Sequence, residues 1–460
     1  MLAQGRIGRT LFSLSAPAIA GMLVMAIYNM VDTFFVSLLR DTTAIAATGI
    51  VFPLFQLIGA VGLTFGMGAA SVVSRRLGEN NHKAAEEAGA TALYSAAIVG
   101  VLLSVIGSIY IRPILTLLGA TDTILAQATL YGRIIIGGSV FQIINMTTNN
   151  LLRSEGASLY SSMGQISGAL LNIILDPLFI FVLDMGVTGA AVATVISQGV
   201  SSAILLSFYL RGRGVLHPLN PVHFLPRWAT YRVLMTLGLP TFVRQVLGGV
   251  SFGFLNNAAA VYGDSAIAAA SVTLRLFMLL FMGLIGLAQG LQPLAGYNYG
   301  AHRYDRVRAT IGLVIRLAIG VGAVSGVITF AFAPYIMRIF TPQDPVVIGM
   351  GVQAIRFMAV ALIPMGLVLM YGGVFQALGD GRSALILATG QQGFFLLPLV
   401  VLLPRIFGLP GVFAAHPAGF VLAFLVGVVL QRRTWERLDR EEAAHAAVDG
   451  ASGTPHTEKS

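Results

Sequence analysis

The sequence predicts an all-α polytopic membrane protein with about twelve transmembrane helices in two pseudo-symmetric six-helix lobes. Three observations lead to this fold class: the scarcity of charge, the number of long apolar runs, and a repeat that relates the two halves. Of the 460 residues, 56% are hydrophobic and only 10% are charged, whereas a soluble domain carries about 25% charged residues. So few charges cannot cover a soluble surface, and lipid must therefore surround most of the chain.

The apolar runs are judged against the roughly 20 residues that a transmembrane helix needs. In the N-terminal half, such runs lie at 10–38, 44–75, 86–110, 124–151, 159–182 and 187–210. In the C-terminal half, they lie at 230–260, 266–296, 308–332, 346–375, 383–403 and 409–431. Several exceed one crossing, which is typical of tilted or protruding helices. The first is far too long for a cleavable signal peptide, so we expect it to remain as a span.

These runs divide the chain into an N-terminal lobe (1–210), a linker (211–228), a C-terminal lobe (229–433) and a tail (434–460). The linker is polar and holds three prolines between Arg211 and Arg227. The tail is charged at first and then rich in Ala, Gly and Ser, and we expect it to be disordered.

Basic residues predict the orientation of the spans, because cytoplasmic loops carry an excess of Arg and Lys. One alternating set of loops holds only Arg40, Arg112, Arg338 and Arg405. The other set holds Arg6, Arg9, Arg75, Arg76, Lys83, Arg153, Arg211, Arg213, Arg227, Arg303, Arg306, Arg308, Arg382, Arg432 and Arg433. We therefore expect both termini on the cytoplasmic side of the inner membrane, as an even number of spans requires. The net charge of +9 is explained by these loops and not by nucleic-acid binding.

The two halves repeat each other at an offset of 222 or 223 residues, which aligns Gly68 with Gly290, Gly78 with Gly300, and Pro17 with Pro240. An even number of helices per half makes the repeat parallel, with its axis along the membrane normal. Transporters often place the substrate site between such halves. The repeat therefore predicts a transporter, with a duplication of purely structural consequence as the alternative.

Apart from the glutamates at the very start of the run 86–110, two acidic residues fall inside the predicted spans, Asp32 and Asp176. A carboxylate in hydrocarbon costs about 2.5–3.5 kcal/mol, so such residues are functional candidates by default. At about 1.5 Å per helical residue, both lie roughly 10–12 Å from the outer ends of their helices. Thr194 and Tyr131 fall at comparable depth on other helices. The polar groups of the first lobe are therefore expected to converge in the outer leaflet.

Each carboxylate has a polar companion one turn earlier on its own helix, Tyr28 for Asp32 and Asn172 for Asp176. Burial and a neighbouring carboxylate both favour the protonated form, so the pair can hold a proton. With oxygens from Asn172 and Thr194, the same pair would instead form a hard-oxygen site suited to Na⁺. A structural ion pair, with Arg133 as partner, is the alternative.

The second half does not repeat the acids, because Leu255 and Leu399 stand at the corresponding positions. We therefore expect ion coupling only in the N-terminal lobe. The second half instead carries four arginines at unexpected depth, Arg244, Arg275, Arg316 and Arg356. For Arg244 the alternative is snorkelling to the cytoplasmic end, and for the other three the alternatives are lining the cavity and pairing with backbone carbonyls.

Pro17 is a candidate hinge in the first helix, since proline removes a backbone hydrogen bond, although a static kink is equally consistent. The candidate cavity residues are Tyr131, Gln142, Asn145, Met25 and Arg244. Polar residues of this kind also hold helices together, and methionines also pack in cores. The sequence contains no GxxxxGK[ST] loop, HExxH motif or cysteine. We therefore expect no ATP hydrolysis, no enzymatic activity and no cofactor.

Four strings carry a resemblance to a known family: YNMVDTFFV (28–36), NIILDPLFIFVLDMGVTGAAVATVISQ (172–198), GLPTFVRQ (238–245) and QGLQPLAGYNYGA (289–301). In this order and spacing the chain resembles the multidrug and toxic compound extrusion (MATE) family over nearly its whole length. The resemblance implies two six-helix lobes in a V, with a cavity that opens alternately to each side. It also places Pro17, Tyr28, Asp32, Asn172, Asp176 and Thr194 at positions that members use for bending, proton relay or sodium coordination.

The function that follows is export of cationic or amphiphilic drugs in exchange for H⁺ or Na⁺. The alternative is a flippase for lipid-linked sugars or anionic lipids of the same superfamily. The expected partners are small cationic or amphiphilic molecules and the lipid bilayer, without nucleic acid, and we expect a monomer.

Overall fold

The computed structural model describes residues 2, 5–39, 41–341 and 344–452, and all regular structure in that part of the chain is helical. The N-terminal lobe consists of α1 (Ile7–Leu38), α2 (Thr42–Gly78), α3 (His82–Ile109), α4 (Ile111–Leu117), α5 (Asp122–Gly137), α6 (Ser139–Ser154), α7 (Ser158–Pro177) with a π-helical turn (Leu178–Val182), and α8 (Gly186–Leu210). The C-terminal lobe consists of α9 (Trp228–Ala260), α10 (Asp264–Gly300), α11 (Tyr304–Phe340), α12 (Pro345–Ala377), α13 (Gly381–Thr389) with a π-helical turn (Gly390–Phe395), α14 (Leu396–Phe407) and α15 (Leu409–Ser452).

The described residues confirm the predicted architecture of about twelve spans. Eleven helical segments are long and apolar enough to cross a membrane, and a bent pair of helices makes a twelfth span. That pair, α5 and α6, corresponds to the run 124–151, which the sequence predicts as one helix. The two helices meet at an angle of 43°. Adjacent Gly137 and Gly138 form the break, and Val195 packs so closely on Gly138 that a side chain there would collide with it.

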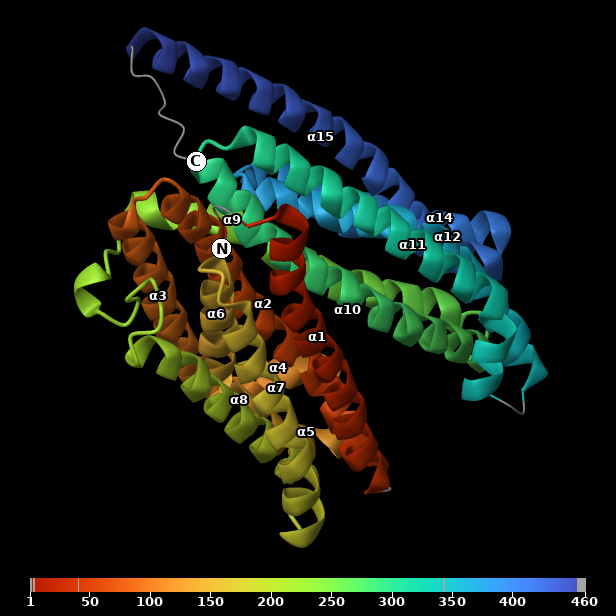
Figure 1. Cartoon of the computed structure of the whole chain (residues 1–460). Coiled ribbons are helices and arrows are strands. Elements are labelled where there is room, and N and C mark those ends of the chain that lie inside the picture. The colour runs from red at the N-terminus through yellow and green to blue at the C-terminus, as the bar shows by residue number, and fades with distance from the viewer. Residues whose placement is uncertain (1, 3–4, 40, 342–343, 453–460) are drawn as a thin grey trace.

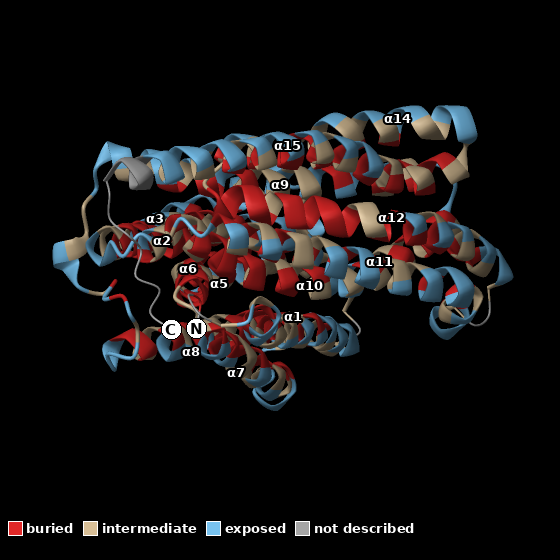
Figure 2. Cartoon of the chain, turned by 45° about the horizontal axis from the view of Figure 1, so that its top comes forward, coloured by how far each residue is buried: buried red, intermediate tan, exposed pale blue. Residues whose placement is uncertain are grey.

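The two lobes diverge from a common vertex and form a V, as Figure 1 shows. Helices α1 to α8 run down the picture and α9 to α15 run to the right. Exposed residues cover the outer faces of the helices, while buried residues line the interior of each lobe (Figure 2). Many of the exposed residues are large and apolar, such as Val182, Ile339 and Phe394. The outer faces therefore have the apolar surface that lipid requires.

The lobes pack against each other through two pairs of helices. In one pair α2 packs on α9, and in the other α1 packs on α10. Close to the vertex, a β-carbon at Gly78 would overlap the carbonyl oxygen of Tyr297, and one at Gly300 would overlap the carbonyl oxygen of Arg75. The aligned glycines of the repeat thus let the two lobes come into backbone contact at the end of the molecule where α1 begins (Figure 1). We call these two glycine contacts the vertex seam.

The loop between the lobes occupies residues 211–227, where the sequence predicts the linker, and it lies against α3. The hydroxyl of Tyr94 donates to the carbonyl of Leu219 at 2.7 Å. The carboxylate of Glu86 contacts His217 at 3.0 Å and His223 at 3.4 Å. The loop is therefore held on the N-terminal lobe.

The predicted disorder of the tail is wrong for residues 434–452, because α15 continues through them. Leu438 is only 1% exposed and packs in the core of the C-terminal lobe. Arg308 on α11 also pairs with Asp439 at 2.6 Å and with Glu442 at 2.7 Å. The alanines and charged residues that suggested disorder are good helix formers once such contacts are available. Residues 453–460 lie outside the described part of the chain.

Candidate functional site

The two membrane carboxylates, Asp32 on α1 and Asp176 on α7, lie within hydrogen-bonding reach of each other. One carboxyl oxygen of Asp32 and both of Asp176 are buried, and none of the three has a hydrogen-bond partner in the described structure, although the amide of Asn172 lies close to Asp176. Two ionised carboxylates in such a place repel each other and lack donors, so the arrangement favours a shared proton or a bound cation.

Three further predicted residues surround this pair. The amide nitrogen of Asn172 on α7 donates to the hydroxyl of Thr194 on α8 at 3.4 Å. The hydroxyl of Tyr28 on α1 also lies beside Thr194, and the oxygen of Asn172 is buried without a donor. Four predicted coupling residues thus meet Asp32 in space, and we call Tyr28, Asp32, Asn172, Asp176 and Thr194 the acid cluster.

The backbone near Asp176 departs from a regular α-helix. Pro177 follows directly and ends α7, since proline lacks the N–H that the helix would use. The chain continues as the π-helical turn Leu178–Val182. Such turns occur frequently at functional sites, because they widen the helix and reorient neighbouring side chains. The sequence NIILDPLF therefore places a carboxylate at a local irregularity of the span.

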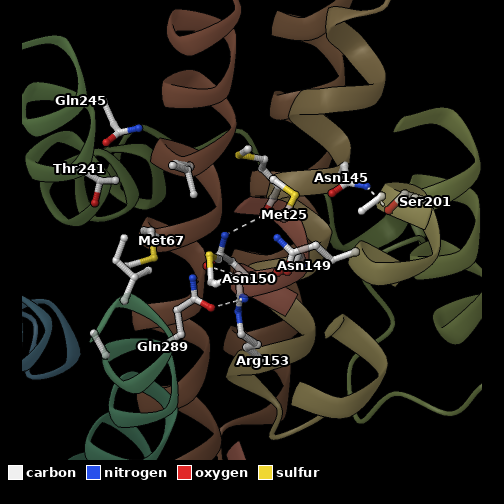
Figure 3. A pocket seen from close by; sticks show the side chains of 18 of the residues that line it. Met25, Met67, Asn145, Asn149, Asn150, Arg153, Ser201, Thr241, Gln245 and Gln289 are labelled. Atoms are coloured by element: carbon white, nitrogen blue, oxygen red, sulfur yellow. Dashed lines mark hydrogen bonds between the residues drawn. The ribbon is translucent and has the colours of Figure 1, made fainter. Parts of the chain in front are cut away.

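A cavity of about 240 Å³ lies between the lobes, lined by residues of α1, α2, α6, α7 and α8 on one side and α9, α10 and α12 on the other. Figure 3 shows part of its lining, including Met25, Asn145, Arg153 and Gln289. Met25, Asn145 and Arg244 line it as predicted, and so do Tyr28, Asn172 and Thr194. The acid cluster therefore adjoins the cavity, although Asp32 and Asp176 are not among the described lining residues.

Two predicted cavity residues lie outside the cavity. Tyr131 on α5 lies near Asp32, behind the cavity wall. The amide nitrogen of Gln142 on α6 donates to the carbonyl of Phe55 on α2 at 3.3 Å. Gln142 is thus used to hold two helices of one lobe together, which spacing along a single helix does not reveal.

Of the four deep arginines, only Arg244 reaches the cavity among the described residues. Arg275, Arg316 and Arg356 are exposed and do not line the cavity, and the guanidinium of Arg356 lies 5.1 Å from the ring centre of Phe330. Arg133 is also exposed, and within the described chain it forms no ion pair with either acid.

Sequence reasoning missed Arg153, which it assigned to a cytoplasmic loop. Arg153 lies in the last turn of α6, is only 4% exposed and lines the cavity. Its guanidinium donates to Gln289 on α10 of the opposite lobe at 2.6 Å and to Asn150 at 3.2 Å (Figure 3). The signal available in the sequence was the polar pair Asn149–Asn150, one turn earlier on the same helix.

Comparison with known proteins gives a consistent set of relatives. The family model MatE matches residues 17–178 and 240–401, corresponding stretches of the two halves. The multidrug export protein MepA of Staphylococcus saprophyticus is 29% identical over 398 residues, 86% of this chain and 87% of the relative. MepA of Staphylococcus haemolyticus is 28% identical over 439 residues, 94% and 96% of the two chains.

Solved structures agree over nearly the full length. A multidrug resistance MATE family transporter of the MOP superfamily, in its outward-facing conformation, superposes with a TM-score of 0.89 at 27% identity. The comparison covers 95% of this chain and 98% of that one. A MATE crystallised in complex with MaL6 superposes with a TM-score of 0.90 at 26% identity, over the same shares of the two chains.

Proposed function

The chain belongs to the MatE family and is a multi-pass multidrug efflux transporter and not an enzyme, and we propose that it is an antiporter driven by protons or sodium ions. The observation that carries the proposal is the acid cluster. It joins two buried carboxyl groups that lack donors to a cavity between two lobes. Multidrug export is the activity in the names of its relatives.

Exchange follows from the residues that face both sites. Tyr28, Asn172 and Thr194 line the cavity and also surround the carboxyl pair. A proton or Na⁺ at the pair engages the same oxygen atoms that an exported molecule would contact. Because these oxygen atoms cannot contact the ion and the exported molecule at the same time, binding of the exported molecule promotes release of the ion, and binding of the ion promotes release of the exported molecule. The coupling residues are thus proposed on geometry, with Na⁺ and H⁺ as alternative driving ions.

Helix α1 offers a route from the carboxyl pair to the lobe interface. It carries Asp32 in one half and packs on α10 in the other, where Ser15 lies directly against Gly290. Pro17 lies between these points in a helix that is otherwise continuous. We propose that Pro17 is a hinge through which a change at Asp32 moves α1 relative to α10.

Substitution of Asp32 by Asn tests this function. The assay uses proteoliposomes supplied with a mixture of two fluorescent amphiphiles, one cationic and one anionic. We expect the native protein to transport at least one of the two dyes under a pH gradient alone or under a sodium gradient alone. We expect D32N to move neither dye at a measurable rate, because an amide cannot exchange a proton or supply a carboxylate to Na⁺.

A matched control is Asp184→Asn, in the loop before α8, where the backbone has a positive φ of 52° that Asn adopts readily. We expect this variant to transport as the native protein does. Gradient-driven transport by D32N, or none by the native protein under either gradient, would overturn the antiport mechanism.

A lipid flippase is not favoured, since the relatives found are multidrug exporters. The location in an inner membrane, with both termini in the cytoplasm, and the monomeric state remain proposals. The cationic nature of the cargo is likewise a sequence-based expectation. The charged residues that line the cavity, Arg153 and Arg244, are relevant to it because both are positive.

A further inference from the structure

We propose that the central cavity recognises its cargo by an anionic group that binds to Arg244. The preferred cargo would be an amphiphile with a carboxylate or a comparable anionic group, either as an anion or as a zwitterion. A cation without such a group would be poor cargo. This inference rests on the proposed function, since it takes the cavity between the lobes to be the transport cavity.

The charge of the cavity carries the inference. Its charged lining residues are Arg153 and Arg244, and the described lining includes no Asp, Glu, Lys or His. A guanidinium remains protonated under all ordinary conditions. The carboxyl pair, Asp32 and Asp176, adjoins the cavity beside α1 and α7 but is not among its described lining residues. Both charges in the described lining are therefore positive, and they favour an anionic group on the cargo at the α9 side, where Arg244 lies.

Of the two cavity arginines, Arg244 is the one whose guanidinium has no protein partner among the described residues. It lies on α9 one turn after Pro240 and also borders a second cavity of about 30 Å³, beside Thr241 and Gln376. Among the described residues it forms no hydrogen bond and no ion pair. Five N–H donors of a part-buried guanidinium thus remain for a ligand, and a carboxylate is the group that satisfies them in pairs.

Arg153 forms hydrogen bonds, but only neutral groups of the described residues accept them. Its two hydrogen bonds go to the amide oxygens of Asn150 and Gln289, so its full charge adds to the field in the cavity. Since Gln289 belongs to the opposite lobe, this bond also ties the lobes together. Arg153 therefore contributes attraction for an anion, whereas the direct contact is assigned to Arg244.

The other lining groups fit the remainder of such a molecule. Four methionines, whose side chains adapt to many shapes, offer surface for an apolar body, namely Met22, Met25, Met67 and Met146. On α7, the side-chain oxygens of Gln165 and Asn172 are buried without donors. They can accept from an ammonium or amine N–H of a zwitterion. Because Asn172 belongs to the acid cluster, that end of the molecule would compete with the coupling ion while the anionic end binds Arg244.

The test uses two dyes that differ in one group: rhodamine B, which carries a free carboxylate, and its ethyl ester, which does not. Binding to the detergent-solubilised full chain is measured by fluorescence anisotropy without any ion gradient. We expect rhodamine B to bind about tenfold more tightly than the ester, as loss of a charge-assisted hydrogen bond implies. Equal or tighter binding of the ester would overturn the inference. This comparison uses the native protein, so it does not depend on the folding of any variant.

Arg244→Gln should abolish the preference for rhodamine B, since the change removes the charge but no hydrogen bond of the described structure. Arg316→Gln is the matched control, because Arg316 is exposed, does not line the cavity and, among the described residues, bonds to the carbonyl of Gly312 alone; it should keep the preference. A folded R244Q that still prefers rhodamine B would overturn the assignment. Failure of gradient-driven transport would count against the antiporter alone, whereas loss of dye discrimination with intact antiport would count against this inference alone.

Discussion

Glu155 is a carboxylate just outside the membrane-spanning segments, in the turn after α6. Its oxygens accept hydrogen bonds from the hydroxyl of Tyr209, from the backbone N–H of Val215 at 2.6 Å and from that of Leu216 at 3.2 Å. Burial nevertheless raises the pKa of Glu155 from 4.5 to about 7, because desolvation of the charge outweighs these bonds. Glu155 therefore links the interlobe loop to the N-terminal lobe in a manner that depends on pH.

The variant Glu155→Gln tests this link. A raised pKa in the folded state means that the contribution of Glu155 to stability is fully present below pH 4.5 and is lost as pH rises to about 7. Glutamine cannot ionise, so the stability of E155Q relative to the native protein should increase between about pH 5 and about pH 8. The relative stability is measured from the thermal unfolding midpoints of E155Q and the native protein in detergent at the two pH values. An unchanged difference between variant and native midpoints would contradict the prediction.

At the scale of elements, the last helix extends beyond the membrane-spanning part of the C-terminal lobe. The hydroxyl of Tyr299 donates to Glu441 at 2.8 Å, and Arg437 donates to the same hydroxyl at 2.8 Å. Leu438 is buried in the lobe core, with Trp435 packed against it. The extension thus covers the ends of α10 and α11 and is a structural part of this lobe.

Truncation after Arg433 should therefore destabilise the protein. Exposure of the surface beneath Leu438 costs about 1.5–3 kcal/mol, and each lost ion pair of Arg308 costs about 0–1 kcal/mol. We expect the thermal unfolding midpoint to fall by several degrees. Truncation after Ser452, which removes only residues 453–460, is the control and should leave the midpoint unchanged. Equal midpoints for the two truncations would show that the extension adds nothing.

At the scale of the whole molecule, the vertex seam decides which end of the V is closed. Gly78 and Gly300 allow the ends of α2 and α10 to approach until backbone touches backbone. A single β-carbon at Gly78 has no space beside Tyr297. The closed vertex of this conformation therefore depends on two glycines that the repeat places at corresponding positions.

Gly78→Ala should open the seam and shift the population toward the conformation in which the opposite ends of the lobes approach. Because the chain has no cysteine, spin labels can be attached uniquely at Leu117→Cys and Val261→Cys, whose native side chains are 88% and 81% exposed. Electron–electron double resonance should give shorter distances between the labels in G78A. Gly312→Ala is the control, since nothing lies within 4 Å of its β-carbon. An unchanged distance distribution in G78A would contradict the prediction.

The fold class, the number of spans, the repeat and the two membrane carboxylates could all be predicted from the sequence. Each of these depends on local composition, because an apolar run must cross the bilayer and a carboxylate within it is conspicuous wherever the rest of the chain lies. The acids Asp32 and Asp176 were visible for this reason, and their companions followed from helical spacing.

Which polar residues face the cavity and which hold helices together could not be predicted, because both depend on how the helices pack. Asn145 and Gln142 are three positions apart on one helix, yet one lines the cavity and the other bonds to α2. Arg153 meets Gln289 across 136 positions of sequence, and α15 stays ordered because Arg308 and the core beneath Leu438 receive it. In each case the environment is supplied by helices distant in sequence, so the burial of a side chain is a property of the packed lobes and not of the helix that carries it.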